Sequence, residues 1–380
     1  MTTAEHERAA RLYETIGVTP IIHMVGTTTR YGGTILRPEA RQVMEDVSGA
    51  LVDLHQLNVK AGEAIAKMLG AEAAVVTSGA AGALLLQAAA VIAGTDPARI
   101  NSLPDTDGMS NEIVMQRAHR MSYDQCYRAA GGTIVDVGFG GSTEEWQMEA
   151  AIGEKTAAVA HIVSPGNGGR GLGLEAVLDI AHRNGVPVIV DAASMLPPRE
   201  NLFKFVAAGA DLVCYSGGKG IRGPQGTGIL LGKADLIEAA RLNAAPHAAI
   251  GRPGKVSKEE IMGLLASLEV FLQGDEDKEM ATYRRRCESL IDHLDEVPGV
   301  TAAVEHDGLV SIIPEAVVRF DASWTGRSAA EIVKALLTGD PPIYAKKLDP
   351  GEGIVFNPFN PTDEEVQTVG RRLREELLAD

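Results

Sequence analysis

The sequence predicts an α/β fold in which helices cover both faces of a mostly parallel β-sheet, with a smaller α+β domain after it. Short apolar segments rich in β-branched residues alternate with longer helical patterns through the middle of the 380-residue chain. This alternation is typical of parallel strands joined by crossover helices. After Gly251 the pattern changes to long amphipathic helices and then to segments typical of antiparallel strands. We therefore divide the chain into residues 1–44, 45–250 and 251–380.

Each part contains its own predicted elements. In residues 1–44 a short helix precedes the stretch GVTPIIHMVG, and we expect this segment to join the small domain or to edge an active site. Residues 251–380 contain one or two long helices, then strands in TAAVEH, GLVSIIPEAVVRF and GIVFNP, and a C-terminal helix. Residues 45–250 contain helices such as AGALLLQAAAVIAG between seven predicted strands: EAAVVTSG, NEIVMQ, GTIVDVG, TAAVAHIV, VPVIVDAA, ADLVCYSG and TGILLG.

Composition and charge exclude several classes of protein. The net charge of −16 disfavours nucleic acid as a partner, because contacts to phosphate backbones need a dense basic surface. No segment approaches about 18 consecutive apolar residues and the N-terminus lacks an apolar signal region, so we expect neither membrane insertion nor secretion. Three cysteines without CxxC spacing fit a reducing cytoplasm. The histidines show no HxH or HExxH spacing, so no metal site is expected.

The stretch TSGAAGALLLQ is a candidate phosphate site. Ser78, Gly79 and Ala80 lie where a predicted strand ends and an Ala- and Leu-rich helix begins. The first N–H groups of a helix are unpaired and lie at the positive end of its dipole, so they bind anions readily. An ordinary strand-to-helix turn fits the same residues, so this stretch alone does not decide between the two.

The stretch VPVIVDAAS places Asp191 directly after a fully apolar strand. Open α/β sheets bind ligands at the carboxyl ends of their strands. A carboxylate buried there needs a cation or hydrogen-bond donors as partners. A helix N-cap is the alternative interpretation, because aspartate is common at strand-to-helix junctions.

Lys219 lies in the glycine-rich stretch YSGGKGIRGPQGTG, which does not fit a nucleotide-binding loop. A Walker loop needs glycine six residues before the lysine and Ser or Thr after it, whereas this sequence has Val213 and Gly220. The other glycine run, GNGGRGLG at 166–173, lacks the context of a dinucleotide-binding fingerprint and is interpreted as a loop.

Covalent chemistry is the remaining function for Lys219. Glycines on both sides suit a backbone that other residues adopt with difficulty and leave room for a cofactor against it. A partly desolvated amine would have a lowered pKa and could condense with an aldehyde to form a Schiff base. Ser216, three residues earlier, could bind a phosphate on the same wall. An exposed turn lysine is the alternative.

The three stretches together match the requirements of pyridoxal phosphate. This cofactor needs a phosphate site, an acid that keeps its ring nitrogen protonated, and a lysine that bonds to its aldehyde. Residues 78–82, Asp191 and Lys219 supply the three in that order along the chain.

These motifs, with GVTPIIHMVGTTTRYGG and GRPGKVSKEEIMGLL, resemble the selenocysteine synthase-like family of fold-type I pyridoxal-phosphate enzymes. The chain is most similar to the branch that includes D-glucosaminate-6-phosphate ammonia-lyase, and the resemblance spans nearly its full length. It implies an aspartate-aminotransferase-like large domain with a seven-stranded sheet. It also implies that Lys219 forms the imine and that Asp191, with Ala193 beside it, binds the cofactor ring.

The resemblance further implies that residues 78–82 and Ser216 bind the cofactor phosphate and that His119 covers the ring. Selenocysteine synthases act on a charged tRNA and carry an extra N-terminal segment, whereas this chain has about 45 residues before its large domain and a strong negative charge. A tRNA substrate is therefore disfavoured, and a small amino acid is expected. An active site at a subunit boundary is usual for the fold, which implies a homodimer or a larger homo-oligomer.

Five residues are candidates for binding the substrate. Arginine and lysine can bind a carboxylate or a phosphate, arginine through a bidentate fork. A surface ion pair is the alternative for each cation. The candidates are Arg30, Tyr31, Arg222, Arg252 and Lys255.

The activity expected from the sequence is a lyase that removes ammonia from a 2-amino-3-hydroxy acid, such as a phosphorylated amino sugar acid. Lys219 would remove the α-proton, and loss of the 3-hydroxyl would lead to a 2-keto acid and ammonia. A racemase, an aldolase or an aminotransferase would use the same residues. A non-catalytic member of the fold is the third alternative.

Overall fold

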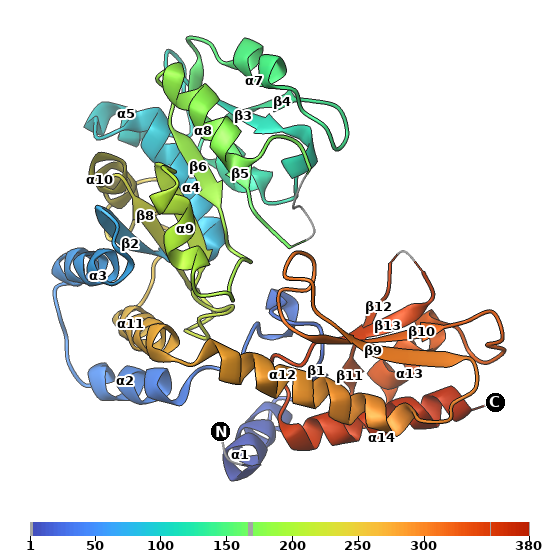
Figure 1. The fold of residues 1–380 in the computed structure, drawn as a ribbon. Coiled ribbons are helices and arrows are strands. Elements are labelled where there is room, and N and C mark those ends of the chain that lie inside the picture. The colour runs from blue at the N-terminus through green and yellow to red at the C-terminus, as the bar shows by residue number, and fades with distance from the viewer. Residues whose placement is uncertain (1–2, 166–169, 350, 380) are drawn as a thin grey trace. The chain divides into compact units, whose positions relative to one another are not determined.

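The structure is a computed structural model that describes residues 3–165, 170–349 and 351–379. The first half of the predicted loop at 166–173 therefore lies outside the described residues. The chain divides into two compact units (Figure 1). The large unit comprises Glu39–Gly274, and the small unit combines Met1–Pro38 with Asp275–Asp380.

The large unit is built on a seven-stranded sheet with the order β2-β8-β7-β6-β5-β3-β4. β8 runs antiparallel to both of its neighbours, and the other neighbouring pairs are parallel. This arrangement confirms the predicted fold class. The strands are β2 (Ala73–Ser78), β3 (Glu112–Gln116), β4 (Thr133–Val137), β5 (Thr156–Ile162), β6 (Val188–Asp191), β7 (Leu212–Ser216) and β8 (Thr227–Gly232).

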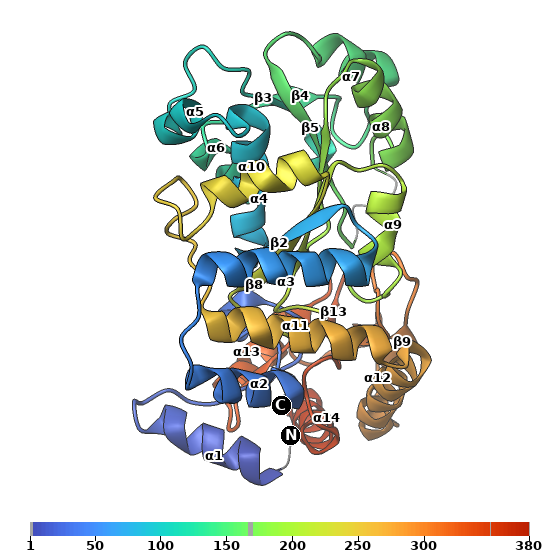
Figure 2. The same cartoon turned by 90° about the vertical axis from the view of Figure 1, so that its left-hand side faces the viewer.

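Helices cover both faces of this sheet. Figure 2 shows α4, α6 and α10 on one side of the strands and α7, α8 and α9 on the other. The helices of the large unit are α2 (Pro38–Ser48), α3 (Leu54–Leu69), α4 (Gly79–Ala93), α5 (Pro97–Ser102), α6 (Asp124–Ala129), α7 (Glu145–Ala151), α8 (Leu174–Arg183), α9 (Asn201–Ala207), α10 (Ala234–Asn243) and α11 (Lys258–Gln273).

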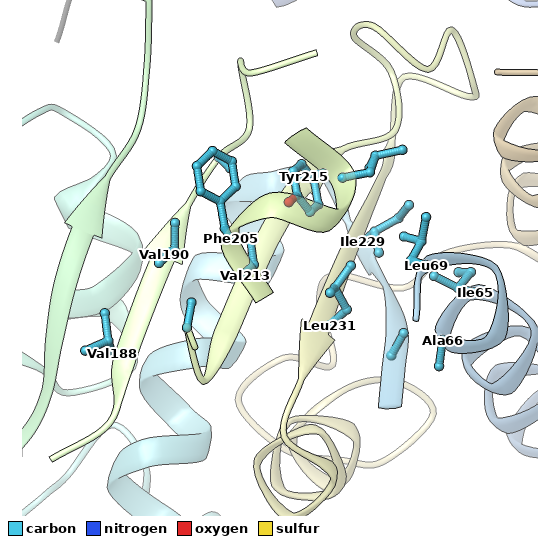
Figure 3. Packing of buried hydrophobic residues seen from close by; sticks show 14 of the residues in the cluster. Ile65, Ala66, Leu69, Val188, Val190, Phe205, Val213, Tyr215, Ile229 and Leu231 are labelled. Atoms are coloured by element: carbon cyan, nitrogen blue, oxygen red, sulfur yellow. The ribbon is translucent and has the colours of Figure 1, made fainter. Parts of the chain in front are cut away.

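Alternation along the central strands divides the apolar side chains between two cores. In β6, Val188 and Val190 contribute to the core that also contains Val213, Phe205 and Tyr215 (Figure 3). Ile189, between them in sequence, contributes to the opposite core, with α4 and α10. Both faces are buried because successive residues of a strand point in opposite directions. Each fully buried Val, Leu or Ile stabilises the fold by about 1.5–3 kcal/mol, which makes the central strands a rigid base for residues at their ends.

The small unit contains a four-stranded antiparallel sheet of order β12-β13-β10-β9 and a parallel pair formed by β1 and β11. The pairing of β1 with β11 joins the N-terminal segment to the C-terminal part of the chain. The elements are α1 (Thr3–Glu14), β1 (Ile22–His23), η1 (Thr29–Tyr31), α12 (Glu276–Ile291), η3 (Asp292–Leu294), β9 (Val300–Glu305), β10 (Glu315–Phe320), α13 (Ala329–Thr338), β11 (Ile343–Tyr344), β12 (Lys346–Lys347), β13 (Gly353–Phe356) and α14 (Asp363–Leu378).

The division between the units differs from the predicted boundary at residues 250/251. It falls after Gly274, because α11 belongs to the large unit. The apolar face of α11, which includes Ile261, Leu264 and Leu268, is buried in the same core as β6 and β7. Amphipathic periodicity predicted this helix but could not indicate which sheet it would cover.

Among the described residues, no helix combines the length and the apolar character needed to cross a lipid bilayer.

Replacement of Gly62 by alanine tests the packing of α3 on the sheet. A Cβ atom at this position would overlap the carbonyl oxygen of Ala74 in β2. Alanine favours a helix over glycine by about 1 kcal/mol, yet we expect Gly62→Ala to destabilise the protein by about 1–3 kcal/mol because the overlap separates α3 from β2. The control Gly49→Ala places its Cβ where no heavy atom lies within 4 Å. Urea unfolding that gave both variants equal stability would contradict this packing.

Candidate active site

The predicted site residues of the large unit lie at the carboxyl ends of its parallel strands. Asp191 ends β6, Ser216 ends β7 and Ser78 ends β2. Asp191 pairs with Ile162 of β5 on one side and with Cys214 of β7 on the other. This edge is where open α/β sheets bind ligands.

Ser78 and Ser216 lie on the two strands that flank β8. Ser216 pairs with Gly228, and so does Thr77, the neighbour of Ser78. The register therefore brings the two serines to the same edge of the sheet, although 137 positions separate them in the sequence. Gly228 allows a close approach, because a Cβ there would lie 2.5 Å from the carbonyl carbon of Gly79.

The N-terminus of α4 has the features of an anion site. Ser78 occupies the N-cap position, but its side chain makes no capping hydrogen bond, and the first turn contains no acidic residue. Gly79 has a φ of +65°, a conformation that residues with a Cβ rarely adopt, and it turns the chain from β2 into α4. The first N–H groups of this 15-residue helix lie at the positive end of its dipole, and the N-cap side chain does not occupy them.

Asp191 is a buried carboxylate with donors on only one of its oxygens. Its Oδ1 accepts hydrogen bonds from the backbone N–H of Ala193 at 2.9 Å and from the thiol of Cys214 at 3.7 Å. Among the described residues, none donates a hydrogen bond to Oδ2. Burial raises the pKa of Asp191, while the Ala193 N–H and the charge of Lys219 lower it. The second oxygen is available for a cationic or N–H partner.

Lys219 is half-buried close to this carboxylate. Its Nζ donates a hydrogen bond to Ser194 Oγ at 2.8 Å. Burial lowers the pKa of Lys219, and the negative charge of Asp191 opposes this shift. A lowered pKa increases the fraction of neutral amine, which is the nucleophilic form.

The glycines around Lys219 have a different role from the predicted one. Gly217, Gly218 and Gly220 do not adopt positive φ values, whereas Arg222 does, with a φ of +59°. A Cβ on Gly218 would lie 2.5 Å from the Cα of Gln225, and Cβ atoms on the other two glycines would also overlap protein atoms. These glycines therefore allow neighbouring segments of the protein to pack closely on the side where a Cβ would lie.

His119 lies in the 3-10 helix η2 (Arg117–His119) directly after β3, and it is buried. Its Nδ1 accepts a hydrogen bond from the backbone N–H of Ile162 at 3.2 Å, so a neutral ring carries its proton on Nε2. The ring of His161 packs edge-on against it, with the centroids 4.6 Å apart. Burial lowers the pKa of both histidines, that of His161 to about 3. At neutral pH the ring of His119 is therefore uncharged. His119 follows β3 and Asp191 ends β6, and β5 lies between these two strands.

The substrate candidates are less closely grouped. Arg252 and Lys255 are exposed in the loop before α11, and a Cβ on Gly254 would lie 3.2 Å from the Cβ of Ser78, so this loop passes the N-terminus of α4. Arg30 and Tyr31 belong to the small unit, where Tyr31 packs on the ring of Tyr344 at 4.1 Å. The structure does not place these two residues relative to Lys219.

Three neighbours of the site were not predicted from the sequence. Ser194 contacts Lys219, Cys214 contacts Asp191, and fully buried Gln87 of α4 donates a hydrogen bond to the carbonyl oxygen of Val190 at 3.1 Å. Ser194 is the last residue of the stretch VPVIVDAAS, so its position after the strand was the available signal. Gln87 is a polar residue in an otherwise apolar helix, which is also a recognisable signal.

No group of three or more His, Cys, Asp and Glu side chains that could hold a metal ion occurs in the described parts of the chain.

The arrangement fits pyridoxal phosphate. The uncapped start of α4 suits its phosphate, the open Oδ2 of Asp191 suits a protonated ring nitrogen, and the half-buried amine of Lys219 suits its aldehyde. The uncharged ring of His119 suits an aromatic partner.

Residues 34–323 match the family described as aminotransferase class-V. The chain belongs to this family. Its members depend on pyridoxal phosphate and share the fold-type I architecture seen in the large unit, which confirms the cofactor and the fold predicted from the sequence.

Individual relatives extend over nearly the whole chain. D-glucosaminate-6-phosphate ammonia lyase from Salmonella typhimurium is 33% identical over 370 residues, covering 96% of this chain and 97% of the relative. A 5'-C-glycyluridine monooxygenase-decarboxylase from Streptomyces sp is 34% identical over 375 residues, covering 96% and 92%. An L-seryl-tRNA(Sec) selenium transferase from Desulfovibrio desulfuricans is 24% identical and covers 92% of this chain and 79% of its own.

The structural comparison agrees with the sequence comparison. A solved structure of D-glucosaminate-6-phosphate ammonia-lyase matches with a TM-score of 0.84 and 32% identity, covering 96% of this chain and 98% of that chain. The resemblance to the selenocysteine synthase-like family is thereby confirmed. The ammonia lyase and the monooxygenase-decarboxylase, both more than 30% identical to this chain, are named for different reactions, so the choice of reaction needs a separate argument.

Asp191→Asn tests the cost of the buried carboxylate. The pKa of Asp191 is higher in the folded protein than in the unfolded chain, so this residue favours the folded state only at low pH. That contribution is lost as the pH rises from the ordinary pKa of aspartate, about 3.9, through the raised pKa of the folded protein. We therefore expect the cofactor-free Asp191→Asn variant to melt at a higher temperature than the cofactor-free wild type at pH 7, with a difference that narrows as pH is lowered.

Asp307→Asn is the control, because removal of this charge should change the melting temperature in the opposite direction. Backbone N–H groups of Leu309, Ser311 and Val310 lower the pKa of Asp307, so loss of its charge should lower the melting temperature at pH 7. Calorimetry in which Asp191→Asn melted below the wild type would show that the carboxylate has its partners within the protein.

Proposed function

We propose that this protein is a pyridoxal-phosphate-dependent ammonia-lyase that acts on a 2-amino-3-hydroxy acid, with a phosphorylated amino sugar acid as the favoured substrate class. The observation that carries the proposal is the similarity to D-glucosaminate-6-phosphate ammonia lyase. It extends over nearly all of both chains in sequence and in structure.

The site residues take the following roles in this proposal. Lys219 holds the cofactor through its amine and, when that amine is released, takes the α-proton of the substrate. Asp191 keeps the ring nitrogen protonated through its open Oδ2, and the first turn of α4, with Ser216, holds the phosphate. His119 covers the ring. When bound, the cofactor withdraws the electron pair left by the α-proton.

The reaction balances without an external oxidant or acceptor. The α-proton moves to Lys219 Nζ, and the 3-hydroxyl leaves with a proton as water. Hydrolysis of the resulting enamine consumes one water, so the net products are a 2-keto acid and ammonia. The substrate is anionic, and the exposed cations Arg252 and Lys255 lie in the loop that passes the start of α4. Arg222, Arg30 and Tyr31 remain further candidates for binding it.

A second candidate reaction rests on the 34% identity to the 5'-C-glycyluridine monooxygenase-decarboxylase. Such a reaction would consume oxygen and release carbon dioxide, whereas the lyase does neither. The structural similarity to the ammonia-lyase favours the elimination. Racemisation, aldol cleavage and transamination use the same amine and remain outcomes of the test.

The protein is proposed to act as a homodimer or larger homo-oligomer in a reducing cytoplasm. Its three cysteines, Cys126, Cys214 and Cys287, are free in the structure, which suits that compartment. The sequence similarity to D-glucosaminate-6-phosphate ammonia lyase, which is named for a small-molecule substrate, supports a small amino acid as the substrate of this protein.

The reaction is tested by incubating the loaded enzyme with phosphorylated and unphosphorylated 2-amino-3-hydroxy acids under nitrogen. We expect equal amounts of ammonia and 2-keto acid, without an added keto-acid acceptor. Lys219→Ala should lower the rate by at least about 10²- to 10⁴-fold, because it removes the proton carrier, and should abolish the visible absorbance of the bound cofactor.

Lys67→Ala, which removes an exposed lysine of α3, is the matched control and should leave both readouts unchanged. Turnover that requires oxygen and releases carbon dioxide would favour the second candidate. Turnover that requires an acceptor would indicate transamination, and a protein that takes up no cofactor would contradict every candidate here.

A further inference from the structure

The amine of Lys219 contacts one side chain by a hydrogen bond in this structure, the hydroxyl of Ser194. The distance from Nζ to Oγ is 2.8 Å, with the amine as donor, and both residues are half-buried. Ser194 lies three positions after Asp191, in the loop that connects β6 to α9.

Close packing of two backbone segments fixes this contact. A Cβ on Gly220 would overlap the carbonyl oxygen of Leu196, so the segment after β7 lies directly against the segment that contains Ser194. Lys219 precedes Gly220 by one residue, and Ser194 precedes Leu196 by two. The glycine that follows the lysine therefore determines which side chain the lysine amine can reach.

The segment around Ser194 is itself held on both sides. The carboxylate of Asp191 accepts a hydrogen bond from Ala193 N–H, and buried Asn201 donates one to the carbonyl oxygen of Met195 at 2.7 Å. The hydroxyl of Tyr215 donates to the carbonyl oxygen of Asn201 at 2.5 Å. Ser194 is thus anchored one residue before and one residue after its own position, and its hydroxyl has little freedom to move.

We propose that Ser194 is a positioning residue for Lys219, which holds the Lys219 amine while that amine is free of the cofactor and carries the α-proton of the substrate. The inference rests on the proposed function, in which Lys219 is released by the substrate amine. At that stage the amine has no bond to the cofactor and can donate a hydrogen bond to Ser194 Oγ. This contact would fix the position from which the amine collects the proton.

The direction of the hydrogen bond suits this role. The neutral amine donates one N–H to Ser194 Oγ and keeps its lone pair for the proton. When the α C–H bond breaks, its electrons stay with the substrate carbon and a new N–H bond forms on Nζ. The resulting ammonium still donates to Oγ, now in a stronger, charge-assisted hydrogen bond. Ser194 thus stabilises the protonated form more than the neutral one.

The surroundings also influence the charge of this amine. Burial disfavours the ammonium, and the carboxylate of Asp191 on β6, to which the Cys214 thiol of β7 donates a hydrogen bond, favours it. Asp191 also binds the cofactor in the proposed function, so its replacement would change several properties together. Ser194 is the neighbour through which the amine can be tested separately.

The first experiment measures how fast the cofactor-free protein takes up pyridoxal phosphate at different pH values, followed by visible absorbance. Uptake requires the neutral amine, so the midpoint of the pH profile reports the protonation of Lys219 without any substrate. Ser194→Ala removes an acceptor that favours the ammonium. We expect its midpoint to lie about one pH unit below that of the wild type, and Ser194→Thr to restore it.

The second experiment measures exchange of the substrate α-proton in deuterated water, by NMR, in the loaded enzyme. Ser194→Ala should slow this exchange on the order of 10-fold, because the amine loses its fixed position, and Ser194→Thr should recover most of the rate. Gly220→Ala would separate the segment that contains Lys219 from the segment that contains Ser194, and it should also slow the exchange. This second variant keeps the proposal testable if Ser194→Ala folds poorly. If the wild type exchanged the α-proton without releasing ammonia, the proposed lyase activity would be refuted. The effect of Ser194 on proton exchange could still be measured in that case.

An unchanged uptake midpoint in Ser194→Ala would overturn the proposal, whatever happens to activity. An unchanged midpoint together with weaker cofactor binding would assign Ser194 to the cofactor alone. An unchanged exchange rate would show that the amine collects the proton from another position.

Discussion

The buried carboxylate of Asp191 is the constraint on which the site depends. It lies at the end of a central strand between two apolar cores, where an unpaired charge is costly. Among the described residues, hydrogen-bond donors reach only one of its oxygens, Oδ1, through Ala193 and Cys214. This incomplete satisfaction makes a cationic ring nitrogen the natural partner. The neighbouring amine of Lys219 then experiences both burial, which lowers its pKa, and the carboxylate, which opposes that shift.

Close backbone packing positions the groups around this carboxylate. Gly228 brings β8 against Gly79 at the start of α4, and Gly220 brings the Lys219 segment against the Ser194 segment. The glycines of the active-site stretch therefore fix distances between protein segments. The candidate site residues Ser78, Asp191 and Ser216 lie at the ends of β2, β6 and β7. A rigid arrangement of this kind lowers the cost of aligning the amine with a substrate carbon.

The sequence was sufficient for the fold because each strand is a short apolar run and each crossover has a helical pattern. It also identified Lys219 and Asp191 as candidates, because a lysine among glycines and an acid after an apolar strand are unusual in themselves. It could not assign α11 to its sheet, since amphipathic periodicity does not name a partner. Nor could it identify Ser194, whose importance arises from a tertiary contact, or the left-handed Arg222, since residues other than glycine rarely adopt that conformation.

In the proposed function, Asp191 Oδ2 keeps the cofactor ring nitrogen protonated. The most direct measurement is the ¹⁵N chemical shift of the ring nitrogen in enzyme loaded with ¹⁵N-labelled pyridoxal phosphate, recorded from neutral to alkaline pH. The account predicts a protonated nitrogen throughout this range in the wild type and loss of that proton in Asp191→Asn. An unprotonated nitrogen in the wild type, or identical shifts in the two proteins, would contradict it.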